Sequence, residues 1–174
     1  MVEQPKYKLI KQDGKIEIRE YSRYVIAKTS IKQTDMNQNN NMFRTLASYI
    51  FGSNSKNQSI PMTAPVITQN TNHNYDMIFF MLDVQKPEDL PTPNDQRISL
   101  EQMEIGKTIS ISFGMWATEK RIQNYKEKLD NYINQKKIQA KSTLMIAQYN
   151  SPWALPPFRK NELLYAINSS ETFP

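Results

Sequence analysis

Hydrophobic and polar residues alternate along the first stretch of the chain. Ile16 and Ile18 are separated and flanked by charged residues, a pattern that predicts a strand with one buried face and one wet face. The dipeptide Asp13-Gly14 precedes them between two strand-like runs, and both residue types tolerate the positive φ of a type I′ turn. We therefore expect a β-hairpin here, followed by another strand over residues 24–31.

The period changes from that of a strand to that of a helix after the polar run "NQNNN". Four apolar residues recur at helical spacing, namely Phe43, Leu46, Ala47 and Ile50. Asparagine is a good N-cap because its side chain accepts a bond from an unpaired backbone N–H. Gly52 suits the left-handed position just past a helix end. These signals predict the first helix.

Two further strands are predicted in the first half of the chain. The stretch "IPMTAPVIT" is interrupted by Pro61 and Pro65, and proline cannot donate to a strand ladder, so this strand is expected at an edge or with a bulge. "YDMIFFML" is apolar without alternation, which favours a buried strand.

The second half of the chain repeats this order of elements. "RISLEQMEI" alternates but slips phase between Leu100 and Met103, as a bulge would cause. Thr118 can cap a second helix with one apolar stripe, and "STLMIAQY" and "ELLYAI" supply two closing strands. Two halves of strand, helix, strand, strand predict a single α+β domain over residues 1–174, in which two helices cover an antiparallel sheet or open barrel. The halves would meet around a shared cleft.

Composition and charge limit the kinds of partner that this chain is expected to bind. It has 174 residues, 39% hydrophobic and 22% charged, enough for one well-packed core. The net charge of +5 is interleaved with acids, as in "EKRIQNYKEKLD". This favours a diffuse solvated surface over a nucleic-acid patch, so we expect no nucleic-acid partner and a monomer.

The same composition bears on location. The longest apolar run, Met77 to Leu82, is too short to cross a bilayer, so no stable membrane insertion is expected. The first residues, "MVEQPKYKLI", lack the basic and apolar segments of a secretory signal. A cytoplasmic location is the simplest expectation.

Motifs that carry chemistry are absent from the sequence. It contains no cysteine and a single histidine, which rules out thiolate catalysis and a cage of histidines around a metal. There is no Gly-rich phosphate loop and no G-x-S-x-G elbow. His73 sits among Asn and Thr residues and is interpreted as an exposed loop residue. We expect no enzymatic activity and no metal site.

The segment "YNSPWALPPFRKNELLYAI", residues 149–167, is an unusual connection between two strands. Its prolines make it rigid, and Trp153 and Phe158 could stack on a planar ligand. Arg159 and Lys160 could pair with carboxylates. Two interpretations stay open, because Trp153 could equally plug the end of the sheet. Two interpretations also stay open for the first helix, because its apolar face could pack on the sheet or border a groove.

Glu162 lies two residues after the second of these cations, Lys160. A buried carboxylate there could attract an organic cation, or it could bond to the backbone or pair with a nearby arginine, since buried carboxylates are usually paired. The second interpretation is the favoured one.

The segment 149–167 closely resembles the signature of the SOUL haem-binding protein family, a Y-(D/N)-x-P loop leading into R-(R/K)-N-E. "PKYKLIKQDGKIEIREYSRYVIAKT", "LASYIFGSNSKNQSIPMTAPV" and "YDMIFFML" resemble the family's opening hairpin and third strand, its helix end with the M-T-x-P-V strand, and its next core strand. The resemblance implies a distorted antiparallel β-barrel with two helices and pseudo-duplicated βαββ units, a fold shared with the effector-binding domains of bacterial regulators.

For function, the resemblance implies reversible, non-catalytic binding of haem or free porphyrin in a shallow groove beside the first helix. The positions that match the family's binding region are Phe43, Ala47, Leu155, Phe158, Arg159 and Lys160. The stretch before the first helix contains no histidine, so no axial iron ligand is assigned. Neutral Asn40 stands at the family's basic helix-flanking position, which weakens the propionate pairing that the resemblance implies. The alternative is an effector-binding module for another amphiphilic or cationic small molecule.

Overall fold

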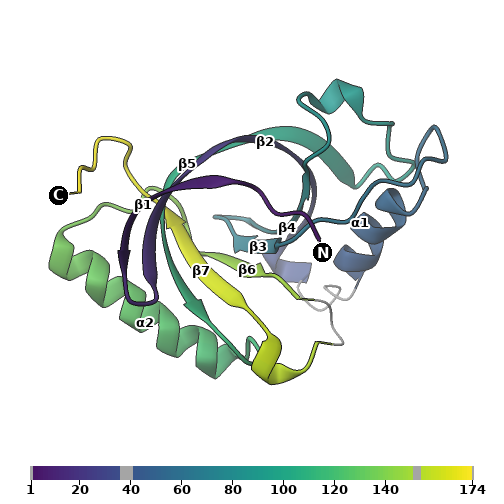
Figure 1. Cartoon of the computed structure of the whole chain (residues 1–174). Helices are drawn as coiled ribbons and strands as arrows, with labels where there is room; N and C mark the ends of the chain where they lie inside the picture. Colours follow the sequence, from purple (N-terminus) through teal and green to yellow (C-terminus); the bar gives the residue numbers. More distant parts are fainter. Residues whose placement is uncertain (1, 36–40, 151–153, 174) are drawn as a thin grey trace. The chain divides into compact units, whose positions relative to one another are not determined.

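The computed structural model describes residues 2–35, 41–150 and 154–173. The predictions made for Asn40, Pro152 and Trp153 lie outside these residues. The elements are β1 (Tyr7–Asp13), β2 (Ile16–Lys32), α1 (Met42–Ile50), β3 (Val66–Asn70), β4 (Asn74–Met81), β5 (Ile98–Phe113), α2 (Glu119–Lys136), β6 (Met145–Gln148) and β7 (Asn161–Ala166), with short 3₁₀ turns η2 (Pro87–Asp89) and η3 (Pro156–Phe158) (Figure 1).

The strand order confirms the predicted fold class. The seven strands hydrogen-bond in the order β1-β2-β4-β3-β6-β7-β5, and an additional β2–β5 pairing closes six of them into a barrel with β1 outside it. The pairings β1–β2, β2–β4, β3–β4, β5–β7 and β6–β7 are antiparallel. With α1 and α2, this is an α+β barrel.

The chain divides into two compact units, and the long strands β2 and β5 each contribute to both. The first unit comprises Met1–Pro5 and Arg23–Met103, and the second comprises Lys6–Ser22 and Glu104–Pro174. In the first unit α1 packs on β4 over a core that includes Leu46, Ile50 and Phe79. In the second unit α2 packs on β7 over a core that includes Leu129, Ile133 and Leu163.

The predicted hairpin is confirmed, but the strand after it is longer than predicted. Gly14 has φ +60° in the turn, and Asp13 pairs with Ile16. β2 then runs unbroken for 17 residues. It stays continuous because its first part pairs with β1 and its second part, from Val25, pairs with β4.

The start of the first helix and the strand after it differ from the predictions in detail. Asn41 occupies the N-cap position, but its side chain makes no capping bond. Instead its carbonyl accepts a hydrogen bond of 2.8 Å from the Thr45 hydroxyl. β3 begins only after Pro65, so neither proline lies within the strand. It therefore needs no edge position, and the expectation of an edge is wrong, since β3 stands between β4 and β6 in the strand order.

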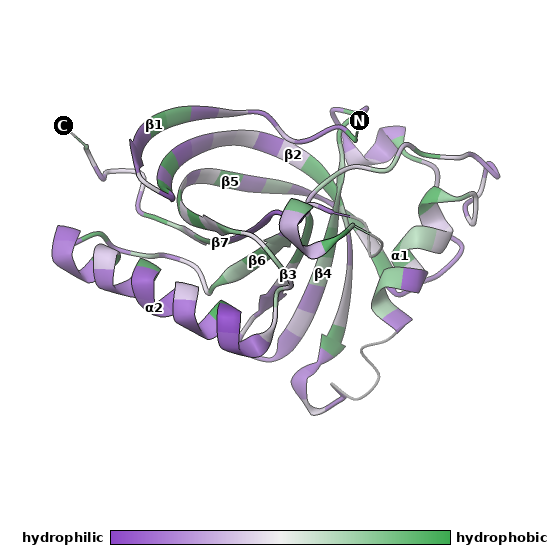
Figure 2. Cartoon of the chain, turned by 60° about the horizontal axis from the view of Figure 1, so that its bottom comes forward, coloured by the Kyte–Doolittle hydropathy of each residue, from purple (hydrophilic) through white to green (hydrophobic). Residues whose placement is uncertain are grey.

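The second helix is as predicted. The Thr118 hydroxyl accepts a bond of 3.2 Å from the backbone N–H of Arg121. Leu129 and Ile133 are buried, while most of the helix is hydrophilic in Figure 2. The phase slip predicted for the start of β5 stays a prediction, because the consecutive residues from Thr108 to Ile111 are all buried and burial therefore does not distinguish the two faces of this strand.

Candidate functional site

Among the described residues of the second unit, the most exposed large apolar side chains lie in the loop before β7. Leu155 is 65% exposed and Phe158 is 76% exposed. η3 lies between β6 and β7 (Figure 1), and its prolines restrict the backbone. The base of the loop is tied, because the N–H of Tyr149 donates to the carbonyl of Lys160 over 3.2 Å and the N–H of Lys160 donates to the Asn150 side chain. The loop therefore presents these two side chains to solvent from a fixed base.

The two cations that follow Phe158 have different environments. Arg159 is buried, its guanidinium lies 4.2 Å from the centre of the Trp116 ring, and Nη1 donates to the carbonyl of Ala154 over 3.1 Å. Lys160 keeps 48% of its side chain exposed, and its Nζ lies 4.4 Å from the centre of the Tyr149 ring. Lys160 is thus the more accessible cation, whereas Arg159 holds the loop.

Glu162, on β7, is almost completely buried and belongs to an ion pair. Its Oε2 lies 2.5 Å from Nη2 of Arg19, and both side chains are at most 3% exposed. Arg19 also contacts Glu17 at 2.6 Å, and Lys160 Nζ lies 3.8 Å from Glu162 Oε1. The interpretation of Glu162 as a carboxylate paired with an arginine is confirmed.

Burial and this ion pair shift the pKa values of neighbouring groups. Burial lowers the pKa of the Arg19 guanidinium, but its hydrogen bond and charge interaction with Glu162 outweigh this and raise the pKa above its usual value. Burial, reinforced by the negative charge of Glu162, raises the pKa of the Tyr149 hydroxyl. Burial also raises the pKa of Tyr21 to about 12. Arg19 is therefore charged and both tyrosines are neutral at pH 7.

The apolar face of α1 packs mainly on the sheet of its own unit. Ala47 is buried, and Phe43, 38% exposed, lies with its ring centre 5.6 Å from that of Phe79 on β4 in a tilted arrangement. Packing on the sheet therefore explains why an apolar residue stands at position 47. Phe43 keeps a third of its surface open to a further contact.

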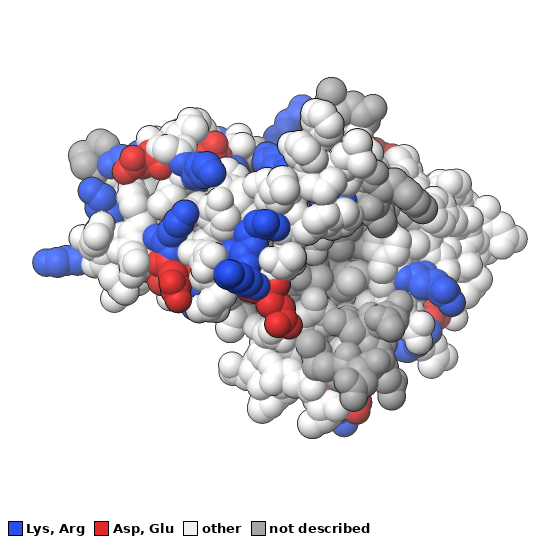
Figure 3. Space-filling model, turned by 90° about the horizontal axis from the view of Figure 1, so that it is seen from below, with Lys and Arg blue, Asp and Glu red and all other residues white. Residues whose placement is uncertain are grey.

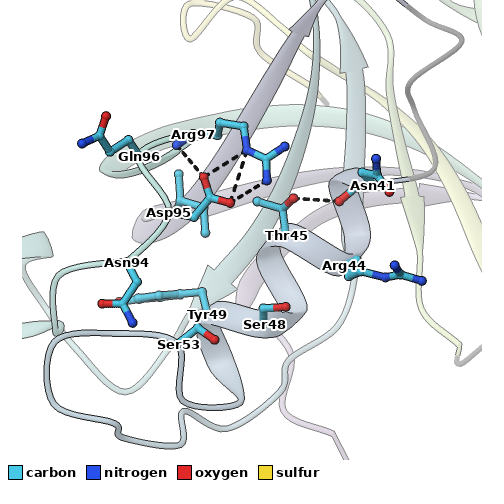
Figure 4. A pocket seen from close by; sticks show the side chains of 11 residues that line it. Asn41, Arg44, Thr45, Ser48, Tyr49, Ser53, Asn94, Asp95, Gln96 and Arg97 are labelled. Carbon is cyan, nitrogen blue, oxygen red and sulfur yellow. Dashed lines mark hydrogen bonds and ion pairs between the residues drawn. The ribbon is translucent and has the colours of Figure 1, made fainter.

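The polar side of α1 borders a hollow that the sequence analysis did not predict. It has a volume of about 540 Å³ and lies between Arg44, Ser48 and the segment 94–98. Figure 4 shows the Asp95 carboxylate in contact with Arg97 at its border, with Nη2 and Oδ2 2.7 Å apart. Phe43 and Ala47 are not among its lining residues. In the sequence, the only sign of this hollow is that polar residues recur at helical spacing from Asn41 to Ser48.

His73 is an exposed residue between β3 and β4, as predicted. The described residues include no group of three or more His, Asp and Glu side chains placed to hold a metal ion. Among the described helices, none has the length and apolar character needed to cross a membrane. On the face in Figure 3, cations lie beside acids rather than in one large patch of a single sign.

The predicted site residues fall into two groups. Phe43 and Ala47 lie one helical turn apart in the first unit. Leu155, Phe158, Arg159 and Lys160 lie together at the end of the loop in the second unit.

Comparison with solved structures finds proteins of similar fold. The C-terminal domain of EcmrR has a TM-score of 0.65, at 8% identity, covering 88% of this chain and 96% of that structure. A structure described as a hydrolase from Listeria innocua has a TM-score of 0.61, at 9% identity, covering 91% of this chain and 94% of that one. At these identities the likeness concerns the fold alone.

Sequence comparison identifies the family. The SOUL heme-binding protein model matches residues 2–166, so the chain belongs to the SOUL heme-binding protein family. Heme-binding protein 1 of Xenopus laevis is 27% identical over 161 residues, covering 88% of this chain and 84% of that protein.

Proposed function

We propose that this protein is a non-catalytic carrier that binds haem or a related tetrapyrrole reversibly. The observation that supports this most is the family match over residues 2–166, together with a relative named as a heme-binding protein. The exposed side chains at the matching positions agree with it. Phe43 and Phe158 each offer an open aromatic surface, and such rings contact a flat macrocycle well.

The macrocycle would be held mainly by apolar contact, at about 25 cal/mol per Å² of buried apolar surface. We propose Phe43 on α1 and Leu155 and Phe158 in the loop as its contacts. Ala47 is buried by packing and therefore adds little contact area. Lys160, with its exposed ammonium group, would pair with a propionate. Arg159, buried against Trp116, would act mainly by fixing the loop.

The residues fit the macrocycle better than they fit an iron ligand. The single histidine, His73, lies in an exposed connection, and residues 22–38 contain no other. When bound, haem iron would supply ligand exchange or redox chemistry. This chain supplies apolar surface and one accessible cation for the ring and its propionates.

An organic cation is the alternative ligand, and Glu162 would have to attract it. Glu162 already faces Arg19 at 2.5 Å, and this buried counter-charge offsets the attraction. The tetrapyrrole is therefore the better-supported ligand. A thermal-shift screen distinguishes the two, because stabilisation by lipophilic cations but not by porphyrins would favour the alternative.

Titration with hemin and with iron-free protoporphyrin tests the proposal. Both should give a saturable Soret change with similar affinities, because recognition does not depend on iron. Phe158→Ala should weaken both by roughly tenfold. Phe51→Ala is the matched control, since Phe51 is 70% exposed and not in the proposed contacts. No saturable change for either ligand would refute the proposal, and a large loss in His73→Ala would refute recognition without a histidine ligand.

A further inference from the structure

Two loops of the second unit are held side by side. The Asn161 side chain donates to the carbonyl of Met115 over 2.9 Å. A Cβ placed on Gly114 would lie only 3.4 Å from the carbonyl oxygen of Arg159. The Arg159 guanidinium covers the Trp116 ring at 4.2 Å. The segment 114–116 is thus fixed against the loop 155–160.

These loops gather exposed apolar side chains, which we call the loop patch: Met115 (43% exposed), Trp116 (45%), Leu155 (65%) and Phe158 (76%). A soluble surface normally spreads such residues singly, and a local concentration marks an interaction site. Only Leu155 and Phe158 belong to the proposed tetrapyrrole contacts, so haem binding leaves Met115 and Trp116 unexplained.

Met115 has a backbone conformation that disfavours its side chain. Its φ is +66°, in the left-handed region where Asn or Gly is more comfortable than a bulky apolar residue. A polar Asn would suit both this backbone and its exposure better. A strained position that keeps an exposed apolar residue is a reason to look for a function of that side chain.

The charges beside the loop patch are mainly positive. Lys160 has a half-exposed side chain, and Arg121 lies next to Trp116, to whose carbonyl its Nη1 donates over 2.6 Å. Lys120 is exposed at the start of α2. The segment 154–160 contains no acid, and Glu119 is the only acid in 114–121. Cations beside exposed aromatic and aliphatic side chains complement an anionic lipid surface.

We propose that the loop patch docks reversibly on anionic phospholipid membranes. Phe158, Leu155 and Met115 enter the boundary between headgroups and acyl chains, and Trp116 lies at the headgroup level, where tryptophan is enriched. The lipid phosphates contact the three cations beside the loop patch, Lys160, Arg121 and Lys120. This contact is peripheral and requires no membrane-spanning element. It does not depend on the proposed haem binding.

Co-sedimentation of the haem-free protein with vesicles tests the proposal. Vesicles of phosphatidylcholine with phosphatidylserine should bind the protein more tightly than phosphatidylcholine alone, and salt should weaken this preference. Phe158→Ser should lower the partition coefficient roughly tenfold. Lys160→Gln should lower it roughly fivefold, and only for the anionic vesicles.

Two further variants separate this proposal from haem binding and from misfolding. Met115→Asn should weaken vesicle binding while leaving hemin affinity unchanged, and Asn fits the left-handed backbone, so the fold should be at least as stable. Phe43→Ala should do the reverse, lowering hemin affinity without changing vesicle binding. Phe51→Ser should leave vesicle binding unchanged.

The proposal is overturned if the wild-type protein does not bind anionic vesicles, or if Phe51→Ser weakens binding as much as Phe158→Ser. It is also overturned if the protein self-associates in sedimentation and Phe158→Ser abolishes the association but not vesicle binding. In that case the loop patch is an interface between protein chains.

Discussion

Arg19 and Glu162 form an ion pair of 2.5 Å that is almost completely shielded from water. Glu162 lies two residues after Lys160, the exposed cation of the loop, and Arg19 lies on β2 in the same unit. The carboxylate that the sequence offers to a cationic ligand is therefore part of the structure of the second unit.

Glu162→Gln should destabilise the protein strongly, because it leaves the Arg19 guanidinium buried with fewer negative partners. Breaking a buried pair costs about 3–5 kcal/mol, and because Arg19 keeps its contact with Glu17 at 2.6 Å, we expect about 3 kcal/mol. Urea unfolding measures this loss. The control is Lys126→Gln, which breaks a half-exposed pair with Asp130 on α2 and should cost about 0.5 kcal/mol. Equal losses in the two variants would contradict the structural role of Glu162.

Stability should fall in alkaline solution because the pKa values of Tyr149 and Tyr21 are raised by burial. Below pH 10.0, the pKa of an unperturbed tyrosine, both residues are protonated in the folded and the unfolded chain, and they add no pH dependence. Above it the unfolded chain loses these protons first, so the unfolded state gains stability. The decline for Tyr21 should extend from pH 10.0 to about 12, with a slope of at most about 1.4 kcal/mol per pH unit per tyrosine.

Unfolding free energies across this pH range provide the measurement. Tyr21→Phe and Tyr149→Phe should each make the alkaline decline shallower. A decline that is as steep in both variants as in the wild type would assign the effect to other groups.

The two cations of the loop should respond differently to the same substitution. Arg159→Gln removes the stacking on Trp116 and a hydrogen bond to Ala154, and should cost about 1–2 kcal/mol of stability. Lys160→Gln should cost about 0.5 kcal/mol or less, but should lower hemin affinity about three- to fivefold through a lost propionate contact. Thermal unfolding and hemin titration of both variants test this. A stability loss in Lys160→Gln as large as that in Arg159→Gln would contradict it.

The elements of the fold could be predicted where a local signal decides the structure. Asp13-Gly14 specifies a turn, and the Thr118 hydroxyl specifies the start of α2, and both were found where predicted. β2 could not be predicted as one strand, because its continuity depends on two partners, β1 and β4, that are distant in sequence.

Prediction of the site was limited by contacts between distant residues. Nothing in the order of residues 149–167 shows that Arg159 stacks on Trp116, which is remote in sequence. The pairing of Glu162 with an arginine followed from the general cost of burying a charge, but the identity of Arg19 required the fold. The polar hollow beside α1 is indicated in the sequence only by polar residues at helical spacing, which is a weak signal.

The two helix starts provide the last prediction, because both have the residue types of an N-cap but only one uses its side chain. Thr118→Ala removes the 3.2 Å bond to the N–H of Arg121 and should destabilise the protein by about 1 kcal/mol. Asn41→Ala should have almost no effect, since the Asn41 side chain makes no capping bond and its carbonyl, which Thr45 uses, remains. Thermal unfolding of the two variants measures the difference. A larger loss in Asn41→Ala than in Thr118→Ala would show that the asymmetry between these helix starts does not hold in solution.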